Sequence, residues 1–339
     1  MKMKKFTIYF LLIFSILLVS CNKDDSNSVK IRDRQEVYDE NIVDIEDYLQ
    51  NNYLDTNDFS VKAIENGESS IWSSLGDTGN PYRLQYITVK NDTRKSIYTD
   101  GENDDPVDYK LYYILINEGG GMHPTSVDST YTAYKGWNLD NEVFDQNNVG
   151  FWSSFPESSV SAVSGFRQIL SLINAEPEGS STVNPDGTVN HFDYGHVIVF
   201  IPSGLAYFNQ VNIGIGQYAP IMFEIKLFRV ERRDHDGDGI LSIYEDLNGD
   251  NNFFNDDTDG DKIPDFYDQD DDNDYKRTKF EIEFEYDDNG EIKTARYPYE
   301  GAAVDDPSTP YDDTKGIPDC NGDFTSPTRL RKYLDPSCN

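Results

Sequence analysis

The middle of the chain contains the stretch His196-Val197-Ile198-Val199-Phe200-Ile201-Pro202-Ser203-Gly204-Leu205-Ala206-Tyr207. Its first half is an unbroken apolar run that stops at a Pro-Ser-Gly sequence, and this pattern predicts a buried strand from His196 to Ile201. Residues 162–173 precede it and have the spacing of a short helix. Similar apolar, β-prone runs predict further strands over Leu111–Ile116, Thr130–Tyr134 and Ile221–Val230. Strands before and after one helix predict an α+β domain with a mostly antiparallel sheet.

The residues before this region are more polar. Between Arg32 and Leu54, apolar side chains recur at helical spacing among acidic residues, which predicts one amphipathic helix. Residues 55–105 carry no chemical motif and contain one predicted strand, Tyr86–Lys90. We therefore assign residues 36–105 to an N-terminal helix and extension.

The composition excludes several functions. The 339 residues include 62 Asp and Glu against 29 Lys and Arg, which gives a net charge of -33. A nucleic-acid binder needs a basic face for the phosphate backbone, and this composition cannot supply one. The phosphate-loop, zinc-spacing and Gly-x-Ser-x-Gly motifs are also absent from the sequence, so nucleotide, zinc and serine-hydrolase functions have no support.

The first twenty residues have the layout of an export signal. Three lysines precede the apolar run Phe6–Val19, which is too short for a comfortable transmembrane helix. The run ends at Leu18-Val19-Ser20-Cys21, which resembles the lipobox of bacterial lipoproteins. The resemblance implies a signal peptide over residues 1–20, an acylated Cys21 that anchors the protein in a membrane, and a tether over residues 21–35. An ordinary signal peptide followed by an incidental cysteine is the alternative.

The residues after Cys21 indicate which membrane the lipoprotein reaches. Asn22-Lys23-Asp24-Asp25 resembles the signal that sends some Gram-negative lipoproteins to the cell surface, and no aspartate directly follows Cys21 to indicate retention at the inner membrane. A flexible acidic tether is the alternative. We expect an outer-membrane lipoprotein that faces the periplasm or the cell surface.

Residues 106–233 carry five short motifs in a fixed order. They are Tyr134-Lys135-Gly136, Val143-Phe144-Asp145, Ala162-Val163-Ser164-Gly165-Phe166, Ile201-Pro202-Ser203-Gly204-Leu205-Ala206-Tyr207 and Ala219–Leu227. In this order and strand-to-helix context they resemble the FKBP-type peptidyl-prolyl cis-trans isomerases. The resemblance implies a twisted antiparallel sheet wrapped around a single helix, with the active site in the hollow between them.

These residue types suit the isomerase reaction. Rotation about an X-Pro bond breaks amide resonance at a barrier of about 20 kcal/mol and requires neither a proton donor nor a nucleophile. An apolar pocket that excludes water and donates hydrogen bonds to neighbouring carbonyls can favour the twisted amide. The resemblance implies that Phe166 forms the floor, that the Val163 amide and the Tyr207 hydroxyl bind substrate carbonyls, and that Tyr134 orients Asp145 at the edge. The resemblance implies a lining of Tyr134, Phe144 and Phe223, with Ile215 from the last loop.

Several positions depart from the family pattern. Phe166 replaces the usual tryptophan. Phe208 replaces the usual glycine after Tyr207, so we expect the tip of that loop to be built differently. No Lys or Arg lies between Gly136 and Phe166 to pair with Asp145, and residues 174–194 form an insertion. An inactive FKBP-like domain, whose aromatic residues are simply core, is the alternative.

The segment over residues 234–275 is strongly acidic, and its carboxylates repel one another unless counter-ions are present. Its first twelve residues fit an EF-hand loop, which predicts a calcium ion held by carboxylates, one carbonyl and one hydroxyl. The predicted ligands are Asp234, Asp236, Asp238, Ile240, Ser242 and Glu245. A strand precedes this loop, so we expect a helix only after it, over Leu241–Leu247. A simple acidic linker is the alternative.

Two further sets of predicted calcium ligands follow. Asp246, Asn248 and Asp250 begin a second loop, and the next set resembles thrombospondin type 3 calcium repeats, although Lys262 stands at the position of their glycine. Residues 270–274 either complete the last site or are simply solvated. The thrombospondin-like set consists of Asp257, Asp259, Asp261, Asp265 and Asp268.

The C-terminal residues 276–339 form a hairpin and a tail. Apolar and charged residues alternate over 280–286, and Asn289-Gly290 is a type I′ turn signal, which together predict a β-hairpin. Cys320 and Cys338 either form a disulfide or remain free, and the exported setting favours the disulfide.

Together these features predict an exported, lipid-anchored, calcium-binding FKBP-type isomerase or folding helper. Its expected substrates are proline-containing exported polypeptides. One alternative is a binding module that holds peptides or a partner without turnover. Another is a calcium-stiffened structural component of the cell surface, such as part of an export or surface-motility assembly.

We predict that Cys21→Ser releases the protein from membranes, because Cys21 is the acylation point implied by the lipobox resemblance. Membrane fractionation without detergent measures the release. A variant that stays fully in the membrane fraction would contradict lipid anchoring.

Overall fold

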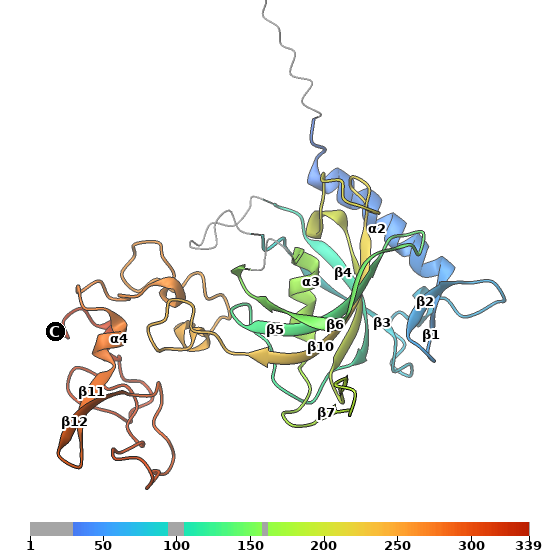
Figure 1. Cartoon of the computed structure of the whole chain (residues 1–339). Coiled ribbons are helices and arrows are strands. Elements are labelled where there is room, and N and C mark those ends of the chain that lie inside the picture. The colour runs from blue at the N-terminus through green and yellow to red at the C-terminus, as the bar shows by residue number, and fades with distance from the viewer. Residues whose placement is uncertain (1–29, 94–104, 158–161, 339) are drawn as a thin grey trace, which may run out of the picture. The chain divides into compact units, whose positions relative to one another are not determined.

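A six-stranded antiparallel sheet is the centre of the fold (Figure 1). The computed structural model describes residues 30–93, 105–157 and 162–338, so Cys21 lies outside the described residues. Every pair of neighbouring strands is antiparallel, which confirms the predicted α+β class. The strands in spatial order are β3 (Leu84–Val89), β4 (Tyr109–Asn117), β9 (Gly195–Ile201), β10 (Ile221–Glu231), β5 (Ser129–Trp137) and β6 (Val143–Ser154).

The burial of strand β9 on both faces explains why its sequence is continuously apolar. All seven of its residues are buried, because both faces of the sheet are covered at this strand. Val197, Val199 and Ile201 belong to the hydrophobic core on one face. Ile198 and Phe200 belong to a second core on the other face.

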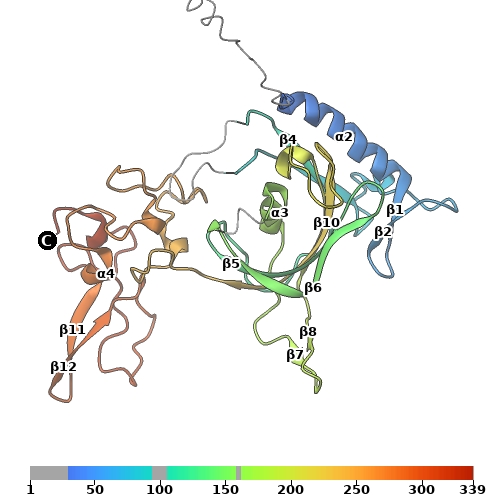
Figure 2. The same ribbon diagram turned by 45° about the horizontal axis from the view of Figure 1, so that its top comes forward.

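Helix α3 (Ser164–Ile169) packs on the first face, and the sheet curves around it (Figure 2). It is shorter than predicted, because Val163 is still extended and Leu170–Leu172 tightens into a 3-10 turn. A Cβ at Gly165 would lie 2.5 Å from the Ile201 side chain. Glycine therefore lets α3 lie directly against β9.

Helix α2 (Arg34–Asn51) packs on the opposite face, so the expectation of a sheet wrapped around a single helix is incomplete. Asp33 caps α2 by accepting a hydrogen bond from the Glu36 amide. Ile45 and Leu49 are fully buried in the second core, so the apolar side of this amphipathic helix is the side that packs on the sheet. A small hairpin, β1 (Asn52–Asp55) and β2 (Ser60–Ala63), and a 3-10 turn, η1 (Trp72–Ser74), follow it.

The two edge strands of the sheet compare differently with the sequence prediction. Strand β6 was not predicted, because it is a polar edge strand whose side chains remain largely on the surface. The other edge strand, β3, confirms the strand predicted over Tyr86–Lys90 and joins this part of the extension to the main sheet. The insertion at 174–194 carries a short hairpin, β7 (Thr182–Val183) and β8 (Val189–Asn190).

The acidic segment contains turns in place of a regular helix. The helix predicted over Leu241–Leu247 is wrong, since only a 3-10 turn, η5 (Ser242–Glu245), forms there. A second 3-10 turn, η6 (Asp265–Tyr267), begins after Pro264. The segment contacts the sheet domain through Val127, which lies in a small core with Phe253, Phe254 and Phe266.

The C-terminal hairpin consists of β11 (Glu283–Asp288) and β12 (Glu291–Arg296). Asn289 and Gly290 both have positive φ, as a type I′ turn requires, so this turn prediction is confirmed. The short helix α4 (Thr278–Glu281) occupies the start of the predicted alternating run. A last 3-10 turn, η7 (Lys332–Leu334), precedes Cys338.

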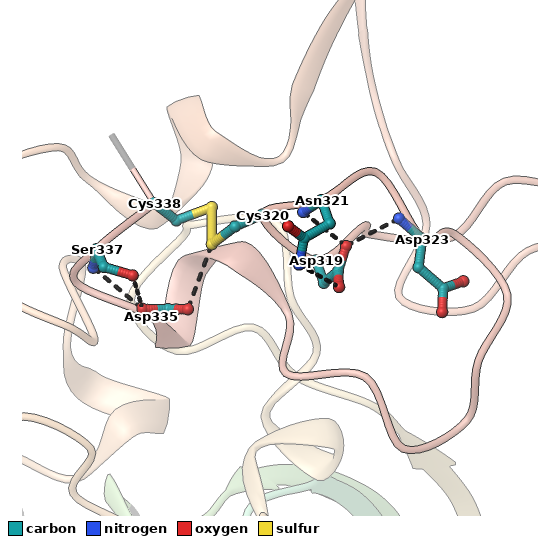
Figure 3. The surroundings of a disulfide bond; sticks show 7 residues. All are labelled: Asp319, Cys320, Asn321, Asp323, Asp335, Ser337 and Cys338. Carbon is teal, nitrogen blue, oxygen red and sulfur yellow. Dashed lines mark hydrogen bonds between the residues drawn. A yellow bond between two sulfur atoms is a disulfide. The ribbon is translucent and has the colours of Figure 1, made fainter.

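Figure 3 shows the disulfide that joins Cys320 and Cys338, whose Cα atoms are 5.3 Å apart. Asp319 lies beside it and accepts hydrogen bonds from the amides of Asn321 and Asp323, each at 2.8 Å. The disulfide ties the end of the tail to this turn. Among the described residues, no helix combines the length and apolar character that crossing a membrane requires.

One residue of α2 holds the loop between β9 and β10. The side-chain amide of Asn41 donates to the Tyr218 carbonyl at 2.9 Å, and its oxygen accepts from the Ser203 amide at 2.8 Å. Ser203 begins the 3-10 turn η4 (Ser203–Leu205) and is fully buried. Asn41 therefore joins the two ends of a loop that contains Tyr207 and Ile215.

We predict that Asn41→Ala lowers the free energy of unfolding by about 1–3 kcal/mol, because it leaves a buried amide without a partner. Urea denaturation measures this loss, and limited proteolysis should show faster cleavage within residues 206–218. Asn51→Ala, at an exposed position of the same helix, is the control and should change stability by less than about 0.5 kcal/mol. Equal effects of the two substitutions would contradict the role of Asn41.

Candidate functional site

Four aromatic side chains meet on the face of the sheet that α3 covers. Phe223 is at their centre, with ring centroids 5.8 Å from Tyr134, 5.6 Å from Phe144 and 5.4 Å from Phe166. All three contacts are edge to face, the favoured geometry of aromatic pairs. Phe166 and Phe223 are only 5% and 6% exposed, whereas Tyr134 and Phe144 are half-buried. The structure thus brings together residues that are distant in sequence.

Gly136 makes this cluster possible. It lies opposite Phe223 of β10 and opposite Asp145 of β6 in the sheet register. A Cβ at this position would be 2.6 Å from atoms of both the Phe144 and Phe223 rings. The glycine of the Tyr134-Lys135-Gly136 motif therefore provides space for the two rings.

Asp145 lies at the exposed edge of the cluster. The Tyr134 hydroxyl donates a 2.5 Å hydrogen bond to its Oδ2 atom. Burial raises the pKa of Tyr134 above its usual value, and the hydrogen bond to Asp145 raises it further. Within the described residues Asp145 forms no ion pair, so Tyr134 is the group that orients it.

Two hydrogen-bond donors near the cluster remain available. In the part of the chain that the structure describes, neither the Tyr207 hydroxyl nor the Val163 amide has a hydrogen-bond partner. Both residues pack against the core that contains Phe166 and Phe223. Burial raises the pKa of Tyr207, and the charge of Asp145 adds to this, so the hydroxyl remains a neutral donor.

The loop after Tyr207 carries a buried aromatic side chain. Phe208 has a φ of 48°, in the left-handed conformation that a glycine adopts readily. Its side chain is buried, with the Arg34 guanidinium 4.2 Å from the ring centroid and the Tyr218 ring edge to face at 5.1 Å. Ile215, further along the loop, is also buried in the core with Phe166. The difference expected at the tip of this loop stays a prediction.

Two cavities lie beside the sheet. One, of about 650 Å³, is lined by Phe155, Leu170 and Phe254 among others. Another, of about 640 Å³, is lined by Val189 and Asn190 of β8 and by Glu224, and Tyr134 of the aromatic cluster also lines it. Phe166 and Phe223 are almost fully buried, so the part of the cluster that a ligand can reach is its half-buried rim, beside Tyr134, Phe144 and Tyr207.

The first acidic loop gathers the predicted carboxylates. Oxygen atoms of Asp234, Asp236 and Asp238 lie within 4.8 Å of one another. The amides of Gly237 and Gly239 donate to Asp234 at 2.8 and 3.1 Å. These bonds fold the chain around a common centre.

Glu245 supplies a buried carboxylate to this region. Only 1% of it is exposed, and neither of its carboxylate oxygens has a partner in the described residues. A second group of acids, with oxygens within 4.8 Å of one another, consists of Asp238, Glu245 and Asp271. Sequence reasoning left Asp271 unassigned because it lies 26 residues beyond Glu245, and only the folded chain brings the two together.

Burial dominates the electrostatics of these acids. It raises the pKa of Asp236 to about 9 and of Asp238 to about 7, with neighbouring carboxylates adding to the shift of each. Burial also raises the pKa values of Glu245 and Asp271 well above the ordinary range. Clustered carboxylates without cationic partners are what a hard cation such as calcium would neutralise.

The remaining predicted ligands of the first and third loops form hydrogen bonds within the acidic segment. The Ser242 hydroxyl lies 2.9 Å from His235 Nδ1, and the Ile240 amide donates to Asp238 at 2.7 Å. Asp265 accepts two hydrogen bonds from Thr258, at 2.8 and 2.9 Å, and Asp268 accepts one from the Asp270 amide at 2.9 Å.

The second and third predicted loops differ from each other. Oxygens of Asp257, Asp259 and Asp261 lie within 4.8 Å of one another. The Asp246 carboxylate accepts hydrogen bonds from the backbone amides of Gly249 and Asn251, each at 2.9 Å. The side-chain amide of Asn248 donates a hydrogen bond to the Asp256 carboxylate at 3.1 Å. Asp250 accepts from the Asn252 amide at 2.7 Å. Calcium binding at both loops stays a prediction.

Comparison with known protein families gives one match. Residues 235–311, which span most of the acidic segment and the C-terminal hairpin, match the family described as BamM C-terminal. The match covers less than a quarter of the chain. No curated protein matches the sequence.

Solved structures of prolyl isomerases and immunophilins show limited similarity. FkpA from Escherichia coli is 21% identical over 36% of this chain and 48% of that chain, with a TM-score of 0.28. A peptidyl-prolyl cis-trans isomerase from Pseudomonas syringae is 20% identical over 40% of this chain and 80% of that chain, with a TM-score of 0.28. A multi-domain immunophilin from Arabidopsis thaliana is 12% identical over 36% of this chain and 43% of that chain, also at 0.28. The match spans less than half of the Escherichia coli chain. A TM-score of 0.28 is too low to establish either a shared fold or a shared activity.

We predict that Gly136→Ala destabilises the sheet domain by about 1–3 kcal/mol, because the added methyl group overlaps the Phe144 and Phe223 rings. Thermal or urea unfolding measures the effect. Gly216→Ala is the matched control, since the nearest atom to its Cβ would be 3.9 Å away. A Gly136→Ala variant as stable as this control would contradict the packing of the cluster.

Proposed function

We propose that this protein is a lipid-anchored folding helper of the FKBP type that acts on proline-containing exported polypeptides at the outer membrane. The observation that carries the proposal is the convergence of Tyr134, Phe166 and Phe223 beside two hydrogen-bond donors without partners. The FKBP-like motifs supply these same residues. The match to BamM C-terminal, a domain of the outer-membrane assembly machinery, supports a role in outer-membrane protein assembly and partners in a membrane-associated complex.

The proposed mechanism needs no covalent chemistry. A proline ring binds against Tyr134 and Phe144 at the half-buried rim of the cluster. The Val163 amide and the Tyr207 hydroxyl donate to carbonyls next to the X-Pro bond, and Asp145 is held by Tyr134. These donors and the apolar surroundings favour the twisted amide over the planar one, which lowers a barrier of about 20 kcal/mol.

A binding module without turnover is the second candidate. The observation that favours it is that Phe166 and Phe223 are almost fully buried, so that a ligand reaches little of either ring. Such a surface can hold an extended peptide at its rim without enclosing the proline. Measuring both the isomerisation rate and the affinity for a proline peptide distinguishes an isomerase from a binding module.

We predict that Phe223→Ala and Tyr207→Phe each reduce proline isomerisation several-fold, because the first removes the central ring and the second removes a donor. A peptide-based isomerisation assay on the soluble form measures the rate, and circular dichroism shows whether each variant is folded. Tyr86→Phe, on the exposed surface of β3, is the control for the lost hydroxyl. Full activity in both variants would place the site elsewhere, and peptide binding without any activity in the unmodified protein would support the binding module.

We also propose that calcium binds the first acidic loop, held by Asp234, Asp236, Asp238, the Ile240 carbonyl and Glu245. The observation that carries this proposal is that both buried oxygens of Glu245 lack a partner in the described structure. A buried carboxylate in this state costs several kcal/mol unless it is protonated or neutralised. Bound calcium would stabilise the folded segment and would serve a structural role.

We predict that millimolar calcium protects the chain between Arg233 and Lys276 from proteolysis and that a chelator removes this protection. Calorimetry should detect binding at about 0.1–1 mM, the range of extracellular calcium modules, and magnesium should substitute poorly. Glu245→Gln should weaken the protection, whereas the exposed Glu291→Gln should not. Cleavage that is insensitive to calcium, together with no heat of binding, would reduce the segment to an acidic linker.

A further inference from the structure

Another group of carboxylates lies at the end of the acidic segment. Oxygens of Asp270, Asp272 and Asp274 lie within 4.8 Å of one another. In each of these residues one buried carboxylate oxygen has no hydrogen-bond partner in the described structure. Three such oxygens that face a common centre resemble the arrangement in the first acidic loop.

The backbone of residues 270–276 shares two features with that loop. Asn273 and Tyr275 have positive φ, of 55° and 76°, as Gly237 and Gly239 have at the corresponding positions. The Lys276 amide donates to Asp274 Oδ1 at 2.7 Å, which is the same bond that Ile240 makes to Asp238. The Tyr275 side chain is 95% exposed, so no packing contact in the core accounts for its left-handed backbone.

Glu281 is a buried acid near this group, since its largest interactions with other charges are those with Asp272 and Asp274. It follows Asp270 at the same spacing in sequence as Glu245 follows Asp234, and it is the last residue of α4. Only 1% of Glu281 is exposed, and neither of its oxygens has a hydrogen-bond partner in the described residues. Lys276 and Lys332 are near enough to influence it electrostatically, but neither hydrogen-bonds to it.

Electrostatics support the same grouping. Burial raises the pKa of Glu281 to about 8, and the next contributions come from Asp272 and Asp274. Burial also raises the pKa of Asp272 to about 6, with Asp274 and Asp270 adding to the shift. These carboxylates therefore act on one another across a short distance.

We propose that Asp270, Asp272, Asp274 and Glu281, with the carbonyl oxygen of Lys276, bind a second calcium ion at the end of the acidic segment. The donor set consists only of hard oxygen atoms with four negative charges, which suits calcium and does not suit zinc or copper. The sequence alone does not indicate this site, because Asn273 and Tyr275 replace the glycines that the first loop has at the corresponding positions, Gly237 and Gly239. The proposal rests on the calcium binding proposed for the first loop.

The new site would be linked to the first one through Asp271. Asp271 lies between two of the proposed ligands, and its own carboxylate belongs to the group of Asp238 and Glu245. Its Oδ2 atom accepts a 2.8 Å hydrogen bond from Thr278, while its Oδ1 atom has no partner in the described structure. An ion at the last loop therefore fixes the backbone that presents Asp271 to the first site, and the two ions should bind cooperatively.

The test uses the full mature chain with Cys21→Ser, so that it is soluble, and calcium alone as the probe. Native mass spectrometry and equilibrium dialysis at 1 mM free calcium, a concentration at which extracellular modules are occupied, count the bound ions. We expect Glu281→Gln and Asp274→Asn each to lose one ion and to weaken binding at the first loop. Glu291→Gln, at an exposed position, is the control and should keep the full number.

Stability provides a second readout. In chelator, Glu281→Gln should be more stable to urea than the unmodified chain, because it removes a buried acid that folding must either protonate or leave unpaired. In the presence of calcium, the unmodified chain should instead be more stable to urea than Glu281→Gln. An unchanged number of ions together with an unchanged order of stability would overturn the second site, whereas the absence of calcium binding to the unmodified chain would overturn the calcium proposal as a whole.

Discussion

Burial of β9 between two hydrophobic cores is the constraint on which the described fold depends. Alternate residues of this strand pack against α3 on one face and α2 on the other. The face toward α3 carries the aromatic cluster of the candidate site. The face toward α2 carries the helix whose Asn41 holds the loop that contains Tyr207. The candidate site therefore depends on packing at both faces of the sheet, and α2 acts as a support for the loop as well as a cover for the core.

The acidic segment obeys a different constraint. Its carboxylates are buried in groups without cationic side chains that hydrogen-bond to them, as at Glu245 and Glu281. Apolar contacts hold only part of it, chiefly the small core around Phe266. Protons or metal ions must supply the missing positive charge, because the burial of several like charges costs too much free energy otherwise. The hydrophobic effect thus orders the sheet domain, whereas neutralisation of charge orders the segment that follows it.

The parts of the fold that sequence reasoning predicted are those with a local signal. The continuous apolar run of β9, the short helix around Phe166 and the Asn289-Gly290 turn belong to this group. Strand β6 was missed because its pairing with β5 is decided by distant residues and its exposed side chains carry no apolar alternation. The motif residues of the candidate site were identified by resemblance, whereas their edge-to-face contacts around Phe223 depend on three-dimensional packing. The role of Asp271 was left open and Glu281 was missed, because spacing along the chain does not show which carboxylates face one another after folding.

The central claim is that the rim of the aromatic cluster binds and isomerises a proline peptide. Nuclear magnetic resonance exchange spectroscopy tests it most directly, with a labelled proline peptide added to the soluble protein. The account predicts faster cis-trans exchange of the peptide, together with chemical shift changes at the Val163 amide and around Tyr207. An unchanged exchange rate with no shift changes at these residues would contradict it.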